Sequence, residues 1–148
     1  MKRGTLLFLR LTIAYLLAIW GADKLVNPEH GLTVSKMFYG GLFGGRSLMP
    51  AYGVVQIALG ALLALGIGRR LLYPAVAAIT ATTLLGVWRS VADPWGWYLE
   101  GSNVLFYPSA VIFAAVLVLW AWRDEDRLVV RTPARAAPRA SLQPDPSR

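Results

Sequence analysis

Four apolar segments, separated by stretches that contain polar residues, Gly and Pro, dominate the chain. They cover about residues 6–22, 50–67, 71–88 and 105–122. A segment of about 17–18 residues forms an α-helix about 26–27 Å long, just enough to cross the hydrocarbon core of a bilayer. Lipid offers no partner for backbone N–H and C=O groups, so such segments must be helical. The pattern predicts an all-α fold, an integral membrane four-helix bundle formed by residues 1–127.

The long connection between the first two segments carries a signal for a further helix. Its start is indicated by Asn27, Pro28 and Glu29, which suit the N-cap, the first position and the first turn of a helix. This short helix is expected to run from Pro28 to about Tyr39 and to stop at the glycine pair that follows. Its apolar residues predict that it lies at the membrane interface of the outer face or covers the mouth of the bundle.

Basic residues are unequally divided between the two ends of the predicted bundle. Eleven of the 15 Lys and Arg residues fall on the side of the N-terminus, the turn at 68–70 and the C-terminal tail. The positive-inside rule therefore predicts a multi-pass protein of the cell inner (plasma) membrane with both termini in the cytoplasm. The net charge of +7 lies on that side. This placement favours anionic lipid headgroups, and not nucleic acid, as its partner.

The composition changes after Trp122. The charged run from Arg123 to Arg127 is expected to end the fourth helix and to extend it by a turn or two into the cytosol. Residues 128–148 are basic and rich in Pro and Ala, which predicts a disordered cytoplasmic tail that is attracted to anionic lipid.

Few residues are suited to chemistry. The chain has no cysteine and one histidine, which excludes disulfides, Fe–S clusters and thiolate zinc sites and disfavours a His-based metal cluster. No nucleophile–base pair, phosphate-binding loop or dinucleotide fingerprint is visible. The sequence therefore predicts no catalytic residue, no metal site and no covalent cofactor, and the chain is not expected to be an enzyme on its own.

An ionisable group at membrane depth marks a candidate functional site. Arg10 lies about one turn inside the first segment, on the helix face that also carries Leu17, Gly21 and Lys24. Two interpretations remain open. Arg10 snorkels to the cytoplasmic headgroups, or it faces the bundle and binds an anionic headgroup, a quinone carbonyl or an acid of a partner subunit.

The second segment carries a narrow stripe of small and polar residues, formed by Gly53, Gln56, Gly60 and Ala64. Such a stripe indicates close helix packing, with Gln56 bonded to a neighbouring helix. The alternative is a ligand site that Gln56 forms with Arg10 and Lys24. In the third segment, Thr80, Thr82 and Thr83 are expected to donate to the carbonyl four residues earlier.

Charged and aromatic residues gather at the segment ends. Near Lys24, four charged residues are expected to form an ion-pair cluster that caps the bundle, in preference to a substrate site: Asp23, Arg89, Asp93 and Glu100. The aromatic residues, Tyr73 and Trp88 among them, are interpreted as interfacial anchors.

Several motifs together resemble the DoxX-type family of membrane proteins over about residues 8–127. The stretch from Arg10 to Pro28 resembles the family's opening, with an Arg early in the first helix and an Asn-Pro turn after it. Residues 56–70 are similar to the second helix and its Gly-x-x-Arg-type turn. The Arg-Asp-x-Asp sequence that ends at Asp126 is similar to the ending of one branch of the family.

The resemblance implies a four-helix membrane fold and a link to thiosulfate:quinone oxidoreduction and membrane redox complexes. One implied role is an accessory or scaffold subunit, in a homo-oligomer or with other membrane subunits. The other is a quinone- or lipid-binding subunit of a redox complex, with Arg10 and Gln56 lining a pocket and the electron carrier on a partner. The lack of redox-active side chains favours the first role.

Overall fold

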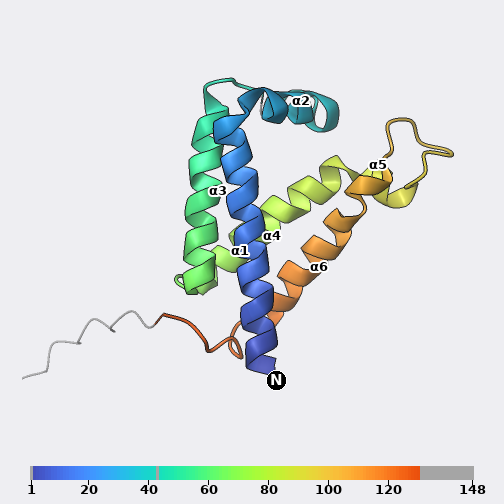
Figure 1. Cartoon of the computed structure of the whole chain (residues 1–148). Coiled ribbons are helices and arrows are strands. Elements are labelled where there is room, and N and C mark those ends of the chain that lie inside the picture. Colours follow the sequence, from blue (N-terminus) through green and yellow to red (C-terminus); the bar gives the residue numbers. More distant parts are fainter. Residues whose placement is uncertain (1, 43, 131–148) are drawn as a thin grey trace, which may run out of the picture.

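The computed structural model describes residues 2–42 and 44–130, and every regular element within them is a helix (Figure 1). In chain order the elements are α1 (Lys2–Val26), α2 (Pro28–Tyr39), α3 (Leu48–Leu65), α4 (Arg69–Gly86), α5 (Trp88–Ala92), the 3-10 helix η1 (Val104–Phe106) and α6 (Pro108–Ala121). The predicted all-α class is confirmed for this part of the chain. Most of the predicted tail, residues 131–148, lies outside the described residues.

Three helical stretches are long and apolar enough to cross a membrane: Lys2–Val26, Leu48–Leu65 and Val104–Ala121. These stretches are those of a membrane protein. The third predicted span is also a helix, α4, and its length of 18 residues equals that of α3. It is not among the three, because two arginines begin it and Pro74 and three threonines interrupt its apolar sequence.

Close antiparallel packing joins α1 to α3. A Cβ atom on Gly21 would lie 2.6 Å from the carbonyl oxygen of Gly53. One on Gly60 would lie 2.7 Å from the carbonyl oxygen of Ala14. Two helices approach this closely only where neither carries a larger side chain. The packing role predicted for the stripe is therefore confirmed at Gly53 and Gly60.

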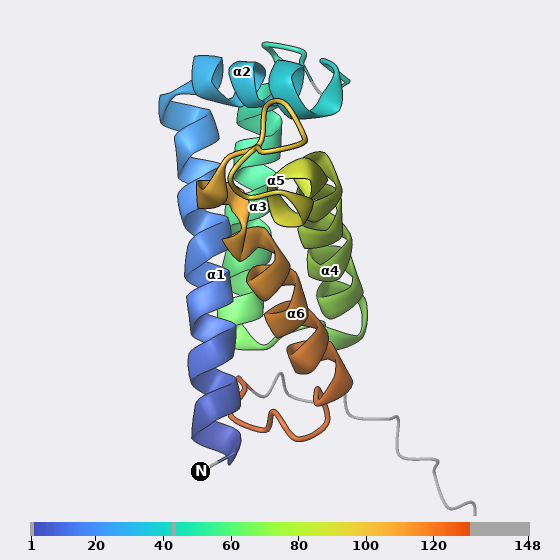
Figure 2. The ribbon, with the colours of Figure 1, turned by 90° about the vertical axis from the view of Figure 1, so that its right-hand side faces the viewer.

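The short helix α2 has the predicted bounds, Pro28–Tyr39, and ends at Gly40, whose φ of 60° is left-handed. Pro28 occupies the first turn, but the Asn27 side chain forms no capping hydrogen bond. The helix lies across the ends of α1 and α3 (Figure 2). We call this end of the molecule the α2 end. The opposite end, which carries the chain's first residues, is the N-terminal end.

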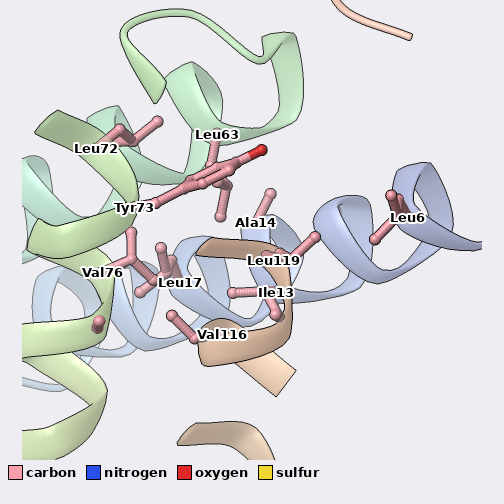
Figure 3. Packing of buried hydrophobic residues seen from close by; sticks show 11 residues of the cluster. Leu6, Ile13, Ala14, Leu17, Leu63, Leu72, Tyr73, Val76, Val116 and Leu119 are labelled. Carbon is pink, nitrogen blue, oxygen red and sulfur yellow. The ribbon is translucent and has the colours of Figure 1, made fainter. Parts of the chain in front are cut away.

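The helices form two pairs. α4 packs mainly along α6, whereas α3, which a short turn joins to α4, packs mainly along α1. The two pairs diverge towards the α2 end (Figure 1). Buried apolar side chains from α1, α3, α4 and α6 fill the space where the pairs converge (Figure 3): Leu6, Ile13, Ala14, Leu17, Leu63, Leu72, Tyr73, Val76, Ala77, Val116 and Leu119.

Candidate functional site

Arg10 lies inside the bundle near its N-terminal end, with 1% of its surface exposed. Its Nη1 atom donates to Oδ2 of Asp126 at 2.6 Å, and Nη2 donates to the carbonyl oxygen of Leu128. The side chain therefore faces the bundle and does not snorkel to the surface. Its partner is an acid of the same chain, not Gln56, because the chain after α6 carries that acid back beneath the helices.

Asp126 is the centre of this site and is fully buried. Besides Arg10, its Oδ2 atom accepts a hydrogen bond from the Tyr73 hydroxyl at 2.7 Å. Tyr73 is 1% exposed, so its interpretation as an interfacial anchor is wrong. Its ring belongs to the core, and its hydroxyl donates to an acceptor, as the hydroxyl of a buried tyrosine usually does. The site thus joins α1, α4 and the segment after α6.

That segment, residues 122–130, turns back under the helices, and we call it the strap (Figure 2). α6 ends at Ala121, so the predicted extension of this helix through Arg123–Arg127 is not formed. Arg69, the first residue of α4, donates through Nη1 to the carbonyl oxygens of Arg123, at 2.6 Å, and Asp126. These bonds satisfy strap carbonyls that helical bonding would otherwise have used.

The strap also contacts the turn between α3 and α4. The Val130 N–H donates to the carbonyl oxygen of Leu65 at 3.0 Å. A Cβ atom on Gly66, whose φ is 71°, would overlap the Val129 side chain. The described structure thus continues packed up to Val130, so the first three residues of the predicted tail, 128–130, belong to the folded part.

The arrangement is suited to holding helices together. Both terminal nitrogens of Arg10 donate within the chain, so the structure does not present them to a ligand. Removal of one partner from a buried ion pair costs about 3–5 kcal/mol, because the other charge is left without compensation. The Arg10–Asp126 pair therefore fixes α1 against the strap, and the Tyr73 hydroxyl adds α4 to the same arrangement.

The predicted ligand site of Arg10, Gln56 and Lys24 is not formed as a unit. Lys24 follows Arg10 by 14 residues of one helix, or about 21 Å, and its Nζ donates to the Trp20 carbonyl oxygen at 3.2 Å. Gln56 lies on α3, where its buried Oε1 atom accepts no hydrogen bond from the described residues. These two side chains remain candidates apart from Arg10.

The predicted ion-pair cluster at the α2 end is also not formed. Among residues 2–42 and 44–130, no ion pair joins two of the four acids and bases assigned to it. Asp23 instead lies 2.7 Å from Nδ1 of His30. The Arg89 guanidinium lies 5.9 Å from the Trp88 ring centroid, a distance at which a cation is attracted to the ring face. Glu100 lines a cavity with Arg89.

Asp93 organises its own loop. Its carboxylate accepts the backbone N–H groups of Trp97 at 3.1 Å, Tyr98 at 2.6 Å and Leu99 at 2.8 Å. These donors, that of Tyr98 first, hold the pKa of Asp93 below its usual value, although burial acts in the opposite direction. A carboxylate that accepts several N–H groups is favoured in its charged form. Asp93 is therefore a structural residue of the loop between α5 and η1.

The sequence contained a signal for Asp126 that pattern reading missed. A buried arginine requires a counter-charge. Three acids follow the fourth predicted span and so belong to the same end of the bundle as Arg10: Asp124, Glu125 and Asp126. Which of the three turns inwards depends on how the strap folds. Comparison of the chain with protein-family models, with curated proteins and with solved structures found no match.

Proposed function

We propose that the chain is a DoxX-like integral membrane protein that serves as an accessory or scaffold subunit of a larger membrane complex. One observation carries this proposal: the charge at depth in α1, Arg10, is neutralised by Asp126 of the same chain at 2.6 Å. An ionisable group at such depth normally marks a ligand or ion site. Here it joins helices instead, which supports a structural role.

The proposal includes four spans, with α4 as the additional one, and both termini in the cytoplasm of the inner membrane. Two features support it. α4 has the length of α3 and runs along α6, so a membrane that contains α6 also surrounds α4. The basic residues Lys2, Arg3 and Arg69 lie near the N-terminal end, where the strap lies too. The α2 helix then lies at the outer interface, and the basic tail meets anionic headgroups.

The helix α6 supplies the surface for a partner. Only 11% of the 18-residue apolar stretch Val104–Ala121, which comprises η1 and α6, is buried inside the chain. The rest faces lipid or another subunit, and a second copy of the chain is one such subunit. Apolar surface alone does not distinguish lipid from protein, because lipid tails are as apolar as leucine.

Site-specific photo-crosslinking in the native membrane tests this role. A photoreactive residue at Val111, which is 61% exposed on α6, is expected to form a defined adduct with one membrane protein. The matched control is Val116 on the same helix, 2% exposed, which should give no such adduct. Lipid adducts alone at Val111, together with recovery of an isolated protein in mild detergent, would contradict the proposal.

A second role, a quinone- or lipid-binding subunit of a redox complex, is favoured by one observation. The Gln56 Oε1 atom is buried and accepts no hydrogen bond from the described residues, and a buried acceptor without a donor is costly. A quinol hydroxyl or a lipid hydroxyl would supply the donor. Quinone that co-purifies with the native chain together with a flavin, haem or molybdenum protein, and is lost in Gln56→Leu, would favour this role over the first.

A further inference from the structure

A cavity of about 230 Å³ opens at the α2 end, between the last residues of α2, the junction of α4 and α5, and the loop before η1. Its lining includes Phe38, Trp88, Arg89 and Glu100. Phe38 packs edge-on against Phe106 of η1, with ring centroids 4.9 Å apart. This contact holds the end of α2 against the segment that begins α6.

The walls of the cavity are fixed by further contacts. A Cβ atom on Gly86 would lie 2.6 Å from the Tyr39 ring, so α2 and α4 touch beside the opening. The Asn103 N–H donates to the Ser90 hydroxyl at 3.0 Å and ties the loop to α5. Asp93 holds the same loop through the N–H of Leu99, and Glu100 follows directly. The cavity is therefore a preformed feature of the α2 end.

The cavity presents one positive and one negative group. Neither Arg89 nor Glu100 forms an ion pair with any of the described residues. The Arg89 guanidinium lies over the Trp88 ring, which orients it without neutralising it. A ligand that carries both charges would meet a complementary partner for each, whereas a ligand with one charge would leave the other group unmatched.

The location is that of lipid headgroups. The cavity lies at the end of α4 that is remote from the N-terminus, beside exposed aromatic side chains of the kind that collect at membrane–water interfaces: Trp88, Trp95, Trp97 and Tyr98. Phe38 and Leu85 give the cavity an apolar part of its wall. A headgroup in this place would keep its acyl chains along α4.

We infer that this cavity binds the headgroup of a phospholipid with a free ammonium group, of the phosphoethanolamine type. The phosphate accepts hydrogen bonds from Arg89, and the ammonium donates to Glu100. A choline headgroup has no N–H to donate. A glycerol headgroup is neutral, so its phospholipid carries the negative phosphate without a positive group for Glu100. This inference depends on the membrane placement of the chain but not on its role as a subunit.

Lipid competition on the purified full-length protein tests the inference. The protein in mild detergent is mixed with equal amounts of phosphatidylethanolamine, phosphatidylcholine and phosphatidylglycerol, and the retained lipid is measured by native mass spectrometry. We expect phosphatidylethanolamine to dominate. Arg89→Gln should lower its retention at least about tenfold, the factor that corresponds to 1.4 kcal/mol. Glu100→Gln should reverse the preference in favour of phosphatidylglycerol.

A matched control is Arg46→Gln, which removes another exposed arginine at the α2 end, one that pairs with Glu29 and does not line the cavity. It should retain lipid as the unaltered chain does. Equal retention of the three lipids, or no change in Arg89→Gln and Glu100→Gln, would overturn the inference. If an equal concentration of free phosphoethanolamine displaces the lipid, the cavity binds a soluble molecule and the inference of a membrane lipid is wrong.

Discussion

At the scale of residues, the buried charged groups near the N-terminal end stabilise the fold by pairing with each other. The Arg10 guanidinium, the Asp126 carboxylate and the Tyr73 hydroxyl form one hydrogen-bonded unit in the interior. Each of these groups would be expensive to bury alone, and the opposite charges of Arg10 and Asp126 offset much of that cost. Arg10 Nε and Asp126 Oδ1 are buried without a hydrogen-bond partner among the described residues. The interior of the N-terminal end is therefore specified by polar pairing as well as by apolar packing.

Replacement of either member of the buried pair should destabilise the protein. We expect Arg10→Leu and Asp126→Leu each to lower the free energy of unfolding by about 3–5 kcal/mol, because each leaves one charge buried without its partner. The double variant should recover most of this loss. Arg10→Lys should restore little of the stability that Arg10→Leu loses, because an ammonium lacks the planar fork that reaches both Asp126 and the Leu128 carbonyl.

Unfolding in mixed micelles of mild detergent and SDS measures these free energies for the purified protein. Circular dichroism before unfolding serves as the control for helix content. Losses that simply add in the double variant would show that the two side chains do not interact, contrary to the 2.6 Å contact.

Asp93 should make the α5–η1 loop sensitive to acid. Its pKa is lowered in the folded protein from the ordinary 3.8. A group with a lowered pKa stabilises the fold above its ordinary pKa, and this contribution is lost as the pH falls through the folded-state value. We therefore expect hydrogen-exchange protection of the Trp97, Tyr98 and Leu99 amides, corrected for the intrinsic rate, to persist at neutral pH and to fall below about pH 4.

The matched variants are Asp93→Asn and Asp93→Ala. Both lack the carboxylate, so both should lose protection of these three amides already at neutral pH. If protection in Asp93→Ala equals that of the unaltered chain, the loop is held by other contacts.

At the scale of elements, the contact between α1 and α3 depends on the absence of side chains. The backbones approach at Gly21, Gly53 and Gly60. Lipid provides no hydrophobic force between helices, so such packing depends on close van der Waals contact. No glycine lies between α4 and α6, because α6 has none and the glycine of α4 is its last residue, Gly86. This pair diverges from the other towards the α2 end (Figure 1).

A single methyl group at Gly60 should disturb this contact. Its Cβ would lie 2.7 Å from the Ala14 carbonyl oxygen, a backbone atom that cannot rotate away. We expect Gly60→Ala to lower the free energy of unfolding by about 1–3 kcal/mol, the usual cost of overpacking. The control is Gly4→Ala in α1, where a Cβ meets nothing within 4 Å and alanine favours the helix. Equal stability of the two variants in detergent would contradict the close approach.

At the scale of the whole molecule, the strap closes one end and α2 covers the other. The strap connects α6 to α1 through Arg10, to α4 through Arg69 and to the α3–α4 turn through Leu65. The two helix pairs are therefore joined at the N-terminal end, where they also share the core (Figures 1 and 3).

Reporter fusions test the proposed topology. A reporter active only outside the cytoplasm should give no signal after Arg131 and a strong signal after Gly41, which follows α2. A fusion after Gly68, between α3 and α4, should be silent. A strong signal after Arg131 would refute the orientation that the basic residues predict.

The sequence by itself determined that the four long helices and α2 exist, because their causes are local. The apolar segments specify α1, α3, α4 and α6, although α1 extends beyond the predicted 6–22 to Lys2–Val26 and α6 begins only at Pro108. Pro28 with Gly40 delimits α2 to the residue, whereas α5 and η1 were not predicted. The spacing of Gly53 and Gly60 likewise indicated a packing face, since seven residues, about two helical turns, place both on one side. The i−4 bonds of Thr80, Thr82 and Thr83 were predicted correctly for the same reason.

Only the tertiary structure decided which polar groups meet. The Arg10–Asp126 pair joins residues 116 positions apart, and no periodicity within a helix reports such a distance. Tyr73 could not be distinguished from an interfacial anchor, because an aromatic residue near a span end suits both the core and the interface. The charges at the α2 end did not pair with one another as expected, because Asp93 satisfies itself with backbone N–H groups only once its loop is folded.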